Sequence, residues 1–221
     1  MPKPASAPGP GPARELRVYL PVEDLQPQFA AAMATPTRAR GYPPLAGEHA
    51  LVIEVAPGLL IERVLDLALK QDPDLEPGIL FVERQFGVVE LHGPDRERLE
   101  RAGRAVLDGL GLSAGQQLRP RIAFSDLIED LSDQHAILVN RSRRASMVLP
   151  GQTLMLCEIV PALFAAVAAN EAERVAPGLT IVDVQMIGAA GRIYMAGATC
   201  DAERALARIG AVLGAIEGRD G

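Results

Sequence analysis

The feature that most constrains the fold of this chain is an internal repeat, in which the second half of the sequence is similar to the first. A shift of 104 residues aligns the middle of the chain with itself without a gap, and it pairs the identical residues Glu54/Glu158, Pro57/Pro161, Leu59/Leu163, Pro73/Pro177, Leu75/Leu179, Gly87/Gly191 and Gly93/Gly197. A shift of 106 residues aligns the flanking segments, for example Leu25 with Leu131 and Asp95 with Asp201. Units of roughly a hundred residues are too long for a solenoid repeat. The repeat therefore predicts two domains of one fold, which can stand in for two subunits of a symmetric ring.

The domain limits follow from where the repeat begins and ends. Residues 1–13 alternate proline with alanine and glycine and are predicted to form a disordered head. Residues 14–115 are the first predicted domain and residues 116–221 the second, joined by a linker near 111–120. Each domain is long enough to bury its own hydrophobic core.

The hydrophobic pattern gives the same order of elements in both repeats. The first repeat predicts strands at 16–22, 50–55, 79–83 and 88–92 and helices at 24–33, 59–70 and 95–110, the last capped by Asp95. The second predicts strands at 121–128, 153–160, 179–186 and 192–196 and helices at 133–140, 161–175 and 201–216. The alanine-rich helix 161–175 is expected to approach its neighbours closely. This order predicts an α+β fold with an antiparallel sheet covered by helices in each domain.

The composition excludes several functional classes. A net charge of −6 and 4% aromatic residues without tryptophan argue against nucleic-acid binding, which needs a basic face and stacking rings. No apolar run is long enough to cross a bilayer, so no membrane contact is predicted. Cys157, Cys200 and the three histidines lack the spacing of metal ligands, and no motif of nucleotide binding or nucleophilic catalysis is present. We therefore expect no metal, no cofactor and no enzyme activity.

One pair of equivalent turns differs between the repeats. The first repeat places Glu83 and Arg84 side by side at a strand end, ahead of Gln85, Phe86 and Gly87. At the same position the second repeat has small and apolar residues, namely Ile187, Gly188, Ala189, Ala190 and Gly191. From the residues alone, the first turn is either a solvent-exposed turn with an incidental charge pair or part of a functional site.

Several motifs, spread from about residue 16 to about residue 216, carry a family resemblance. They are residues 24–28, 54–58, 66–70, 82–84 and 86–87 in the first repeat, and 140–141, 143–144, 146–147, 150–151, 168–173 and 191–192 in the second. On these motifs the chain resembles the two-domain bacterial microcompartment shell proteins that form trimers, and it is most similar to the carboxysome subgroup with a gated pore. Gln85 departs from that pattern, since the family usually has a small residue there. The second turn also lacks the usual phenylalanine before Gly191.

The resemblance implies a fold, an assembly and a location. Each domain would be a circularly permuted shell domain, and three chains would form a pseudo-hexameric disc that tiles with the hexameric shell proteins of the same compartment. Two such discs can stack face to face. The protein would be a structural component of the carboxysome shell in the bacterial cytoplasm, with no cofactor. Its central pore would pass small anionic metabolites such as sugar phosphates.

The resemblance also implies roles for particular residues. Glu83 and Arg84 would meet their symmetry mates on the threefold axis and form the gate. The pore would be lined by Gln85, Phe86, Gly87, Ile187, Gly188, Ala189, Ala190 and Gly191, with Gly87 and Gly191 giving the turns backbone freedom. Lys70 and Arg174, at the ends of equivalent helices, would lie at the tile edge. A cation at a helix C-terminus is also favoured by the helix dipole alone.

Three alternatives remain open from the sequence. A shell protein of a catabolic microcompartment would share these motifs, and neighbouring genes would separate the two cases. A soluble trimeric ligand-sensing α+β module would use the same tandem but would have no reason to assemble into sheets. An enzyme with a site between subunits would need a catalytic cluster that the sequence lacks.

Overall fold

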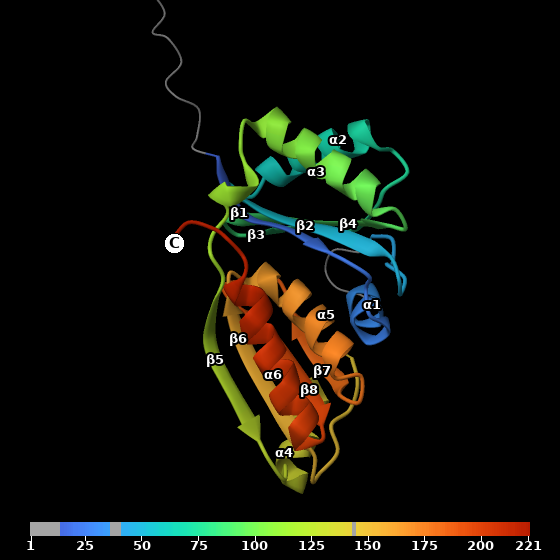
Figure 1. The fold of residues 1–221 in the computed structure, drawn as a ribbon, viewed down its shortest axis with the longest axis vertical. Helices are drawn as coiled ribbons and strands as arrows, with labels where there is room; N and C mark the ends of the chain where they lie inside the picture. Colours follow the sequence, from blue (N-terminus) through green and yellow to red (C-terminus); the bar gives the residue numbers. More distant parts are fainter. Residues whose placement is uncertain (1–13, 36–40, 143–144) are drawn as a thin grey trace, which may run out of the picture.

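The computed structural model describes residues 14–35, 41–142 and 145–221, so the predicted head at 1–13 lies outside the described residues. Two four-stranded antiparallel sheets form the framework (Figure 1). The first has the order β1-β2-β4-β3, with β1 Glu15–Val22, β2 His49–Ala56, β4 Phe86–Gly93 and β3 Glu76–Glu83. The second has the order β5-β6-β8-β7, with β5 Arg121–Ile128, β6 Thr153–Val160, β8 Gly191–Gly197 and β7 Thr180–Gln185. The shared strand order confirms the tandem α+β fold.

The helices follow the predicted order with small shifts at their ends. They are α1 Pro27–Ala34, α2 Leu60–Gln71, α3 Arg96–Leu110, α4 Asp133–Ser142, α5 Ala165–Val175 and α6 Thr199–Gly214. Proline lacks a backbone N–H, so Pro27 is tolerated at the first helical position and α1 begins there rather than at residue 24. Asp95 caps α3 as predicted, because its carboxylate accepts from the backbone N–H groups of Glu97 and Arg98.

One predicted helix is divided in the structure. The segment 161–175 contains the short 3₁₀ helix η2, Ala162–Phe164, followed by α5. A second 3₁₀ helix, η1 Ala114–Gln116, lies in the predicted linker and spans the predicted domain limit between 115 and 116. The linker is tied to the first sheet, since the Leu118 N–H donates to the Arg17 carbonyl at 3.0 Å.

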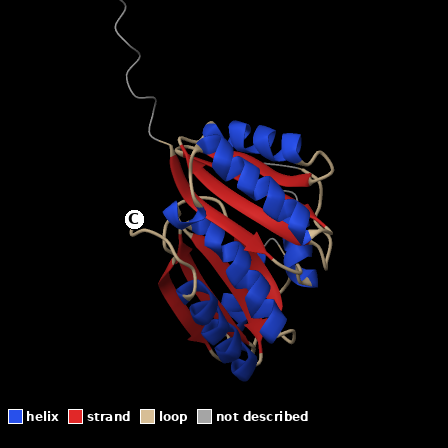
Figure 2. Ribbon diagram, turned by 45° about the horizontal axis from the view of Figure 1, so that its top comes forward, coloured by secondary structure: helices blue, strands red, loops and turns tan. Residues whose placement is uncertain are grey.

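Helices separate the two sheets and bind the halves into one body (Figures 1 and 2). α2 and α3 pack on one face of the first sheet, around Ile61, Val64 and Val106. The other face packs against α1 and α5, and its side chains share a continuous core with the second half. The alanines of α5 are fully buried there, at Ala165, Ala166, Ala168, Ala169 and Ala172. Their small side chains allow the close approach that the sequence predicted, and α5 becomes the central helix of the chain.

Candidate functional site

The turn that was predicted to form the gate is a tight hairpin with two residues between its strands. β3 ends at Glu83 and β4 begins at Phe86, so Arg84 and Gln85 form the turn. Phe86 and Gly87, which were expected in the turn, belong to β4 because their pairing with Glu83 and Val82 continues the ladder. Arg84 has a φ of 45°, in the left-handed region that favours glycine. The turn therefore holds a bulky residue in a strained conformation at its tip.

The charges of this turn are only loosely paired. The Arg84 Nε lies 3.8 Å from the Glu83 Oε1, and the Arg84 side chain is 92% exposed. An exposed ion pair at this distance contributes little stability. Both side chains are therefore free to take other partners.

The equivalent turn of the second half is longer and uncharged. β7 ends at Gln185 and β8 begins at Gly191, with residues 186–190 between them. Gly188 has a φ of 125°, which only glycine adopts readily. Met186 and Ile187 are partly buried against the shared core, so apolar packing anchors the start of this turn.

The fold brings the two turns to a common hollow. A cavity of about 390 Å³ is lined from the first half by Ala32, Met33, Ile79, Phe81 and Glu83, and from the second half by Val184, Gln185, Met186, Ile187 and Gly188. Glu83 thus lies near Ile187 and Gly188 although about one repeat length separates them in the chain. The predicted residues Arg84, Gln85, Phe86, Gly87, Ala189, Ala190 and Gly191 do not line this hollow.

Gly87 and Gly191 are required for close packing rather than for backbone freedom. Neither residue has a positive φ. A Cβ atom on Gly87 would lie 2.1 Å from the Gly58 carbonyl oxygen, and one on Gly191 would lie 2.2 Å from the Ala162 carbonyl oxygen. The expectation that these glycines loosen the turns was wrong, because each one lets the start of a helix or 3₁₀ helix lie directly on the strand.

Sequence reasoning missed the Arg17 brace, by which we mean the hydrogen bond from Arg17 to Glu54 together with the stacking of Arg17 on Phe86 beside the first turn. The Arg17 Nε donates to the Glu54 Oε1 at 2.6 Å, and the Arg17 guanidinium lies 3.7 Å from the centre of the Phe86 ring. Burial raises the pKa of the Glu54 carboxyl, while the hydrogen bond and charge of Arg17 act in the opposite direction. In the second half the equivalent Glu158 pairs instead with Arg192 of β8, at 2.7 Å. The sequence did contain a signal for these ion pairs. Glu54 and Glu158 are identical in the two repeats, and each lies in an otherwise apolar strand.

The two predicted tile-edge cations have different surroundings. The Lys70 Nζ is 2.9 Å from the Asp66 Oδ2 one turn earlier on α2, and its side chain is exposed. Arg174 reaches across to the first half, where it donates to the Asp24 carboxylate and to the Glu23 carbonyl, both at 2.7 Å. Its side chain is nevertheless one-third exposed. Arg174 thus lies at the junction of the two halves and at the surface, and the edge role of both residues stays a prediction.

Other kinds of site have no basis in the described residues. No group of three or more His, Cys, Asp or Glu among them is arranged to hold a metal ion. The two cysteines, Cys157 and Cys200, are free thiols, and burial raises the pKa of Cys157 to about 11. Across the same described ranges, every helix is too short or too polar to span a membrane.

Comparison with known sequences gives a consistent set of relatives. A family model described as the CsoS1D N-terminal domain matches residues 16–116. The carboxysome shell protein CcmP of Synechococcus elongatus is 41% identical over 183 residues, which cover 83% of this chain and 84% of CcmP. The carboxysome shell protein CsoS1D of Hydrogenovibrio crunogenus is 38% identical over 184 residues, covering 83% of this chain and 88% of that protein.

Two solved structures are similar to this chain in both fold and sequence. The double-ringed trimeric shell protein MSM0271 from the RMM microcompartment is 60% identical, with a TM-score of 0.91 over 95% of this chain and 100% of that chain. The fused permuted hexameric shell protein MSM0275 from the same microcompartment is 42% identical, with a TM-score of 0.86 over 92% and 100% of the two chains. These relatives confirm the predicted permuted tandem and a structural rather than enzymatic class. The chain therefore belongs to the family of tandem-domain microcompartment shell proteins that includes CcmP and CsoS1D.

Proposed function

We propose that three copies of this chain form a pseudo-hexameric disc, which serves as a tile of the carboxysome shell. The observation that carries this proposal is the pair of sheets with identical strand order in one chain, since three such chains supply six equivalent units. The carboxysome relatives, at 38–41% identity, support the compartment. The hexameric shell proteins of that compartment are the expected neighbours of the tile, and two discs can stack face to face. This places the chain in the shell, within the bacterial cytoplasm.

The first turn is proposed to form a gate at the centre of the disc. Three copies of Glu83 and Arg84 crowded on an axis must pair with one another or be hydrated, because an unpaired charge removed from water costs several kcal/mol. Pairing between neighbouring copies would close the pore, and hydration of the separated charges would open it. The loose 3.8 Å contact between the two side chains supports a turn that can do both.

The remaining pore residues would set its width and selectivity. Gln85 in the first turn, Phe86 at the start of β4, and Ile187, Gly188, Ala189 and Ala190 in the second turn are proposed to line the opening. Gly87 and Gly191 would lie beside it, packed against the starts of the neighbouring helices. An open pore ringed by Arg84 would favour small anions, of which sugar phosphates are the expected cargo.

One observation favours the shell of a different microcompartment as the location of this tile. The 60% identity to MSM0271 exceeds the identity to the carboxysome relatives, and that protein comes from the RMM microcompartment. The second candidate function is therefore a tile of a microcompartment of that type, built from the same disc. Affinity purification from the native host separates the two cases, because the shell and cargo proteins that co-purify belong to one compartment only.

The disc itself is tested by light scattering over a range of concentrations. Three chains of 23.5 kDa predict a particle of about 70 kDa, and a stacked pair of discs twice that. A monomer or dimer at every concentration would remove the pore, the gate and the shell role together.

A further inference from the structure

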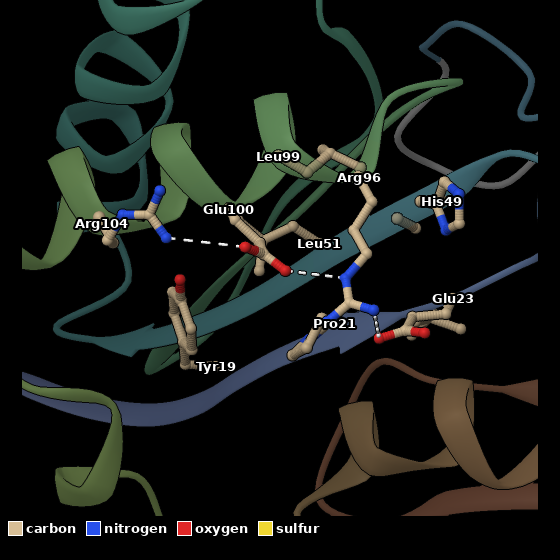
Figure 3. A pocket seen from close by; sticks show the side chains of 11 residues that line it. Tyr19, Pro21, Glu23, His49, Leu51, Arg96, Leu99, Glu100 and Arg104 are labelled. Atoms are coloured by element: carbon tan, nitrogen blue, oxygen red, sulfur yellow. Dashed lines mark hydrogen bonds and ion pairs between the residues drawn. The ribbon is translucent and has the colours of Figure 1, made fainter.

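A cavity of about 240 Å³ lies in the first half of the chain, between α3, the end of β1 and the start of β2 (Figure 3). Its lining comes from residues 19–23, 49–51 and 96–104, so a single chain builds the whole cavity. The lining is largely apolar and includes Leu51 of β2 and Leu99 of α3. Because the volume is below that of drug-sized ligand sites, the cavity suits a small molecule rather than a nucleotide or a peptide.

The hydroxyl of Tyr19 reaches this cavity because α3 has no side chain at one position. A Cβ atom on Gly103 would lie 2.1 Å from the Tyr19 Oη, so glycine is needed there to leave room for the hydroxyl. In the second half the counterparts of Tyr19 and Gly103 are Ser125 and Ile209, and Ile209 is completely buried. The tyrosine and the glycine are therefore matched to each other, and the second repeat has neither.

A row of alternating charges borders the cavity (Figure 3). The Arg96 Nε donates to the Glu100 Oε1 at 2.8 Å, and the Arg96 Nη1 lies 2.8 Å from the Glu23 Oε1. The Arg104 Nη1, in contrast, is 3.7 Å from the Glu100 Oε2, which is too long for a hydrogen bond. Within the described ranges the Arg104 guanidinium makes no hydrogen bond. The row therefore offers one cation with open donors, whereas both carboxylates already have a partner.

The Tyr19 hydroxyl lies on the same side of the cavity as Arg104 (Figure 3). Burial raises the pKa of Tyr19, although the nearby charge of Arg104 acts in the opposite direction. The hydroxyl therefore stays protonated and can donate a hydrogen bond beside the guanidinium. The charges that α3 places around the cavity are absent from α6, which has small or apolar residues at the same positions, namely Ala202, Leu206 and Gly210.

We propose that this cavity binds a small monocarboxylic acid with an apolar body. Its carboxylate accepts from the Arg104 guanidinium and the Tyr19 hydroxyl, since two neighbouring donors match the two oxygens of a carboxylate. Its apolar body lies against Leu51 and Leu99. None of the lining residues belongs to the predicted pore, so this site goes beyond the proposed shell role.

Two other ligand classes fit the charges less well. A phosphate ester would bring a second negative charge beside Glu100. An amine would have to displace Arg96 from Glu100 and Glu23, to which it already donates or pairs at 2.8 Å. A monocarboxylate meets the open donors without either cost.

Isothermal titration calorimetry of the full chain tests the site with benzoate as the probe. Benzoate should bind with a Kd of about 1 mM or tighter. Benzamide, its uncharged isostere, and acetate, which has no ring, should each bind at least about 10-fold more weakly, because each lacks one of the two recognised features. No saturable binding of benzoate, or equal binding of benzoate and benzamide, would overturn the proposal. Tighter binding of phenyl phosphate than of benzoate would contradict the choice of a monocarboxylate.

Variants on α3 locate the binding. Arg104→Gln should weaken the binding of benzoate about 10-fold and change that of benzamide little. Arg101→Gln is the matched control, because Arg101 is also exposed on α3 and lies 3.7 Å from Glu97 four residues earlier, but does not line the cavity. Tyr19→Phe should weaken benzoate binding about 5-fold through loss of one hydrogen bond.

The circular dichroism spectrum checks that each variant is folded. Equal affinity of the Arg104→Gln and Arg101→Gln variants for benzoate would show that the carboxylate is not held at this cavity. Since one chain builds the site, a protein that binds benzoate but never forms the disc would contradict the proposed function and leave this inference standing.

Discussion

Arg17 lies over the ring of Phe86, with its guanidinium 3.7 Å from the ring centre, while its Nε donates to the buried Glu54. This stacking connects β1 to the residue that follows the turn with Glu83 and Arg84. The second turn has Ala190 at the position of Phe86, so the same brace cannot form there. The base of the charged turn is therefore fixed, and movement of a gate would be confined to Glu83, Arg84 and Gln85.

Arg17→Ala should destabilise the chain by about 3 kcal/mol, because it leaves the buried Glu54 carboxylate without its partner. The free energy of unfolding from urea titration measures this effect. Arg192→Ala is the matched control: it removes the partner of Glu158, which is about one-third exposed, and should cost less than about 1 kcal/mol. Equal losses for the two variants would show that burial of Glu54 does not decide the effect.

The double variant Glu83→Ala/Arg84→Ala should change the populations of open and closed pores. Without the charged groups, neither the paired nor the hydrated arrangement has a reason to form. Electron cryo-microscopy of the assembled discs, sorted by the conformation of the turn, measures the populations. Populations equal to those of the wild type would contradict the gate.

Arg84→Gly should be more stable than Arg84→Ala by about 1 kcal/mol, because glycine adopts a φ of 45° without a Cβ penalty. Both variants lose the charge, so the difference isolates the backbone strain at the turn. Thermal unfolding of the two proteins gives the comparison. If the alanine variant were equally stable, the strain at residue 84 would be refuted.

Lys70→Ala should reduce the formation of sheets of discs without dissolving the trimer. The change removes an exposed cation, and an exposed ion pair contributes less than about 1 kcal/mol. Negative-stain microscopy at high protein concentration reports on the sheets, and light scattering reports on the trimer. Lys70→Arg, which copies the residue found at 174, is the control and should still form sheets. Unaltered tiling by Lys70→Ala would exclude the edge role.

Stability should fall as the pH rises above about 6.5, because His92 is buried among acidic groups. Burial alone would lower the pKa of His92, but the hydrogen bond and charge of Glu90 and the charges of Glu48 and Glu76 raise it above its usual value. The folded state then holds the proton more tightly than the unfolded state, so this stabilisation is complete below about 6.5 and is lost as the pH passes through the raised pKa.

Urea titrations between pH 6 and pH 9 test this dependence. His92→Gln should flatten the decline, whereas His135→Gln, which changes an exposed ring on α4, should leave it in place. A wild-type free energy of unfolding that stays constant over this range would show that the His92 proton is not held more tightly in the folded state.

The sequence by itself determined the two-domain plan and the order of strands and helices. The two-domain plan rests on the repeat, which is visible when the chain is aligned with itself. The order of elements rests on local signals, such as the proline at the start of α1 and the Asp95 cap, which act over a few residues. Comparison of the two repeats also singled out the turn with Glu83 and Arg84, because the equivalent turn of the second repeat is uncharged.

Only the tertiary structure decided which groups meet across the repeats. The steric reason for Gly87 and Gly191, the Arg17 brace and the pairing of Arg174 with Asp24 all depend on contacts between residues far apart in sequence. Side-chain packing of this kind has no period and no fixed spacing along the chain. These contacts depend on the position of α5 between the two sheets, and only the folded chain establishes that position.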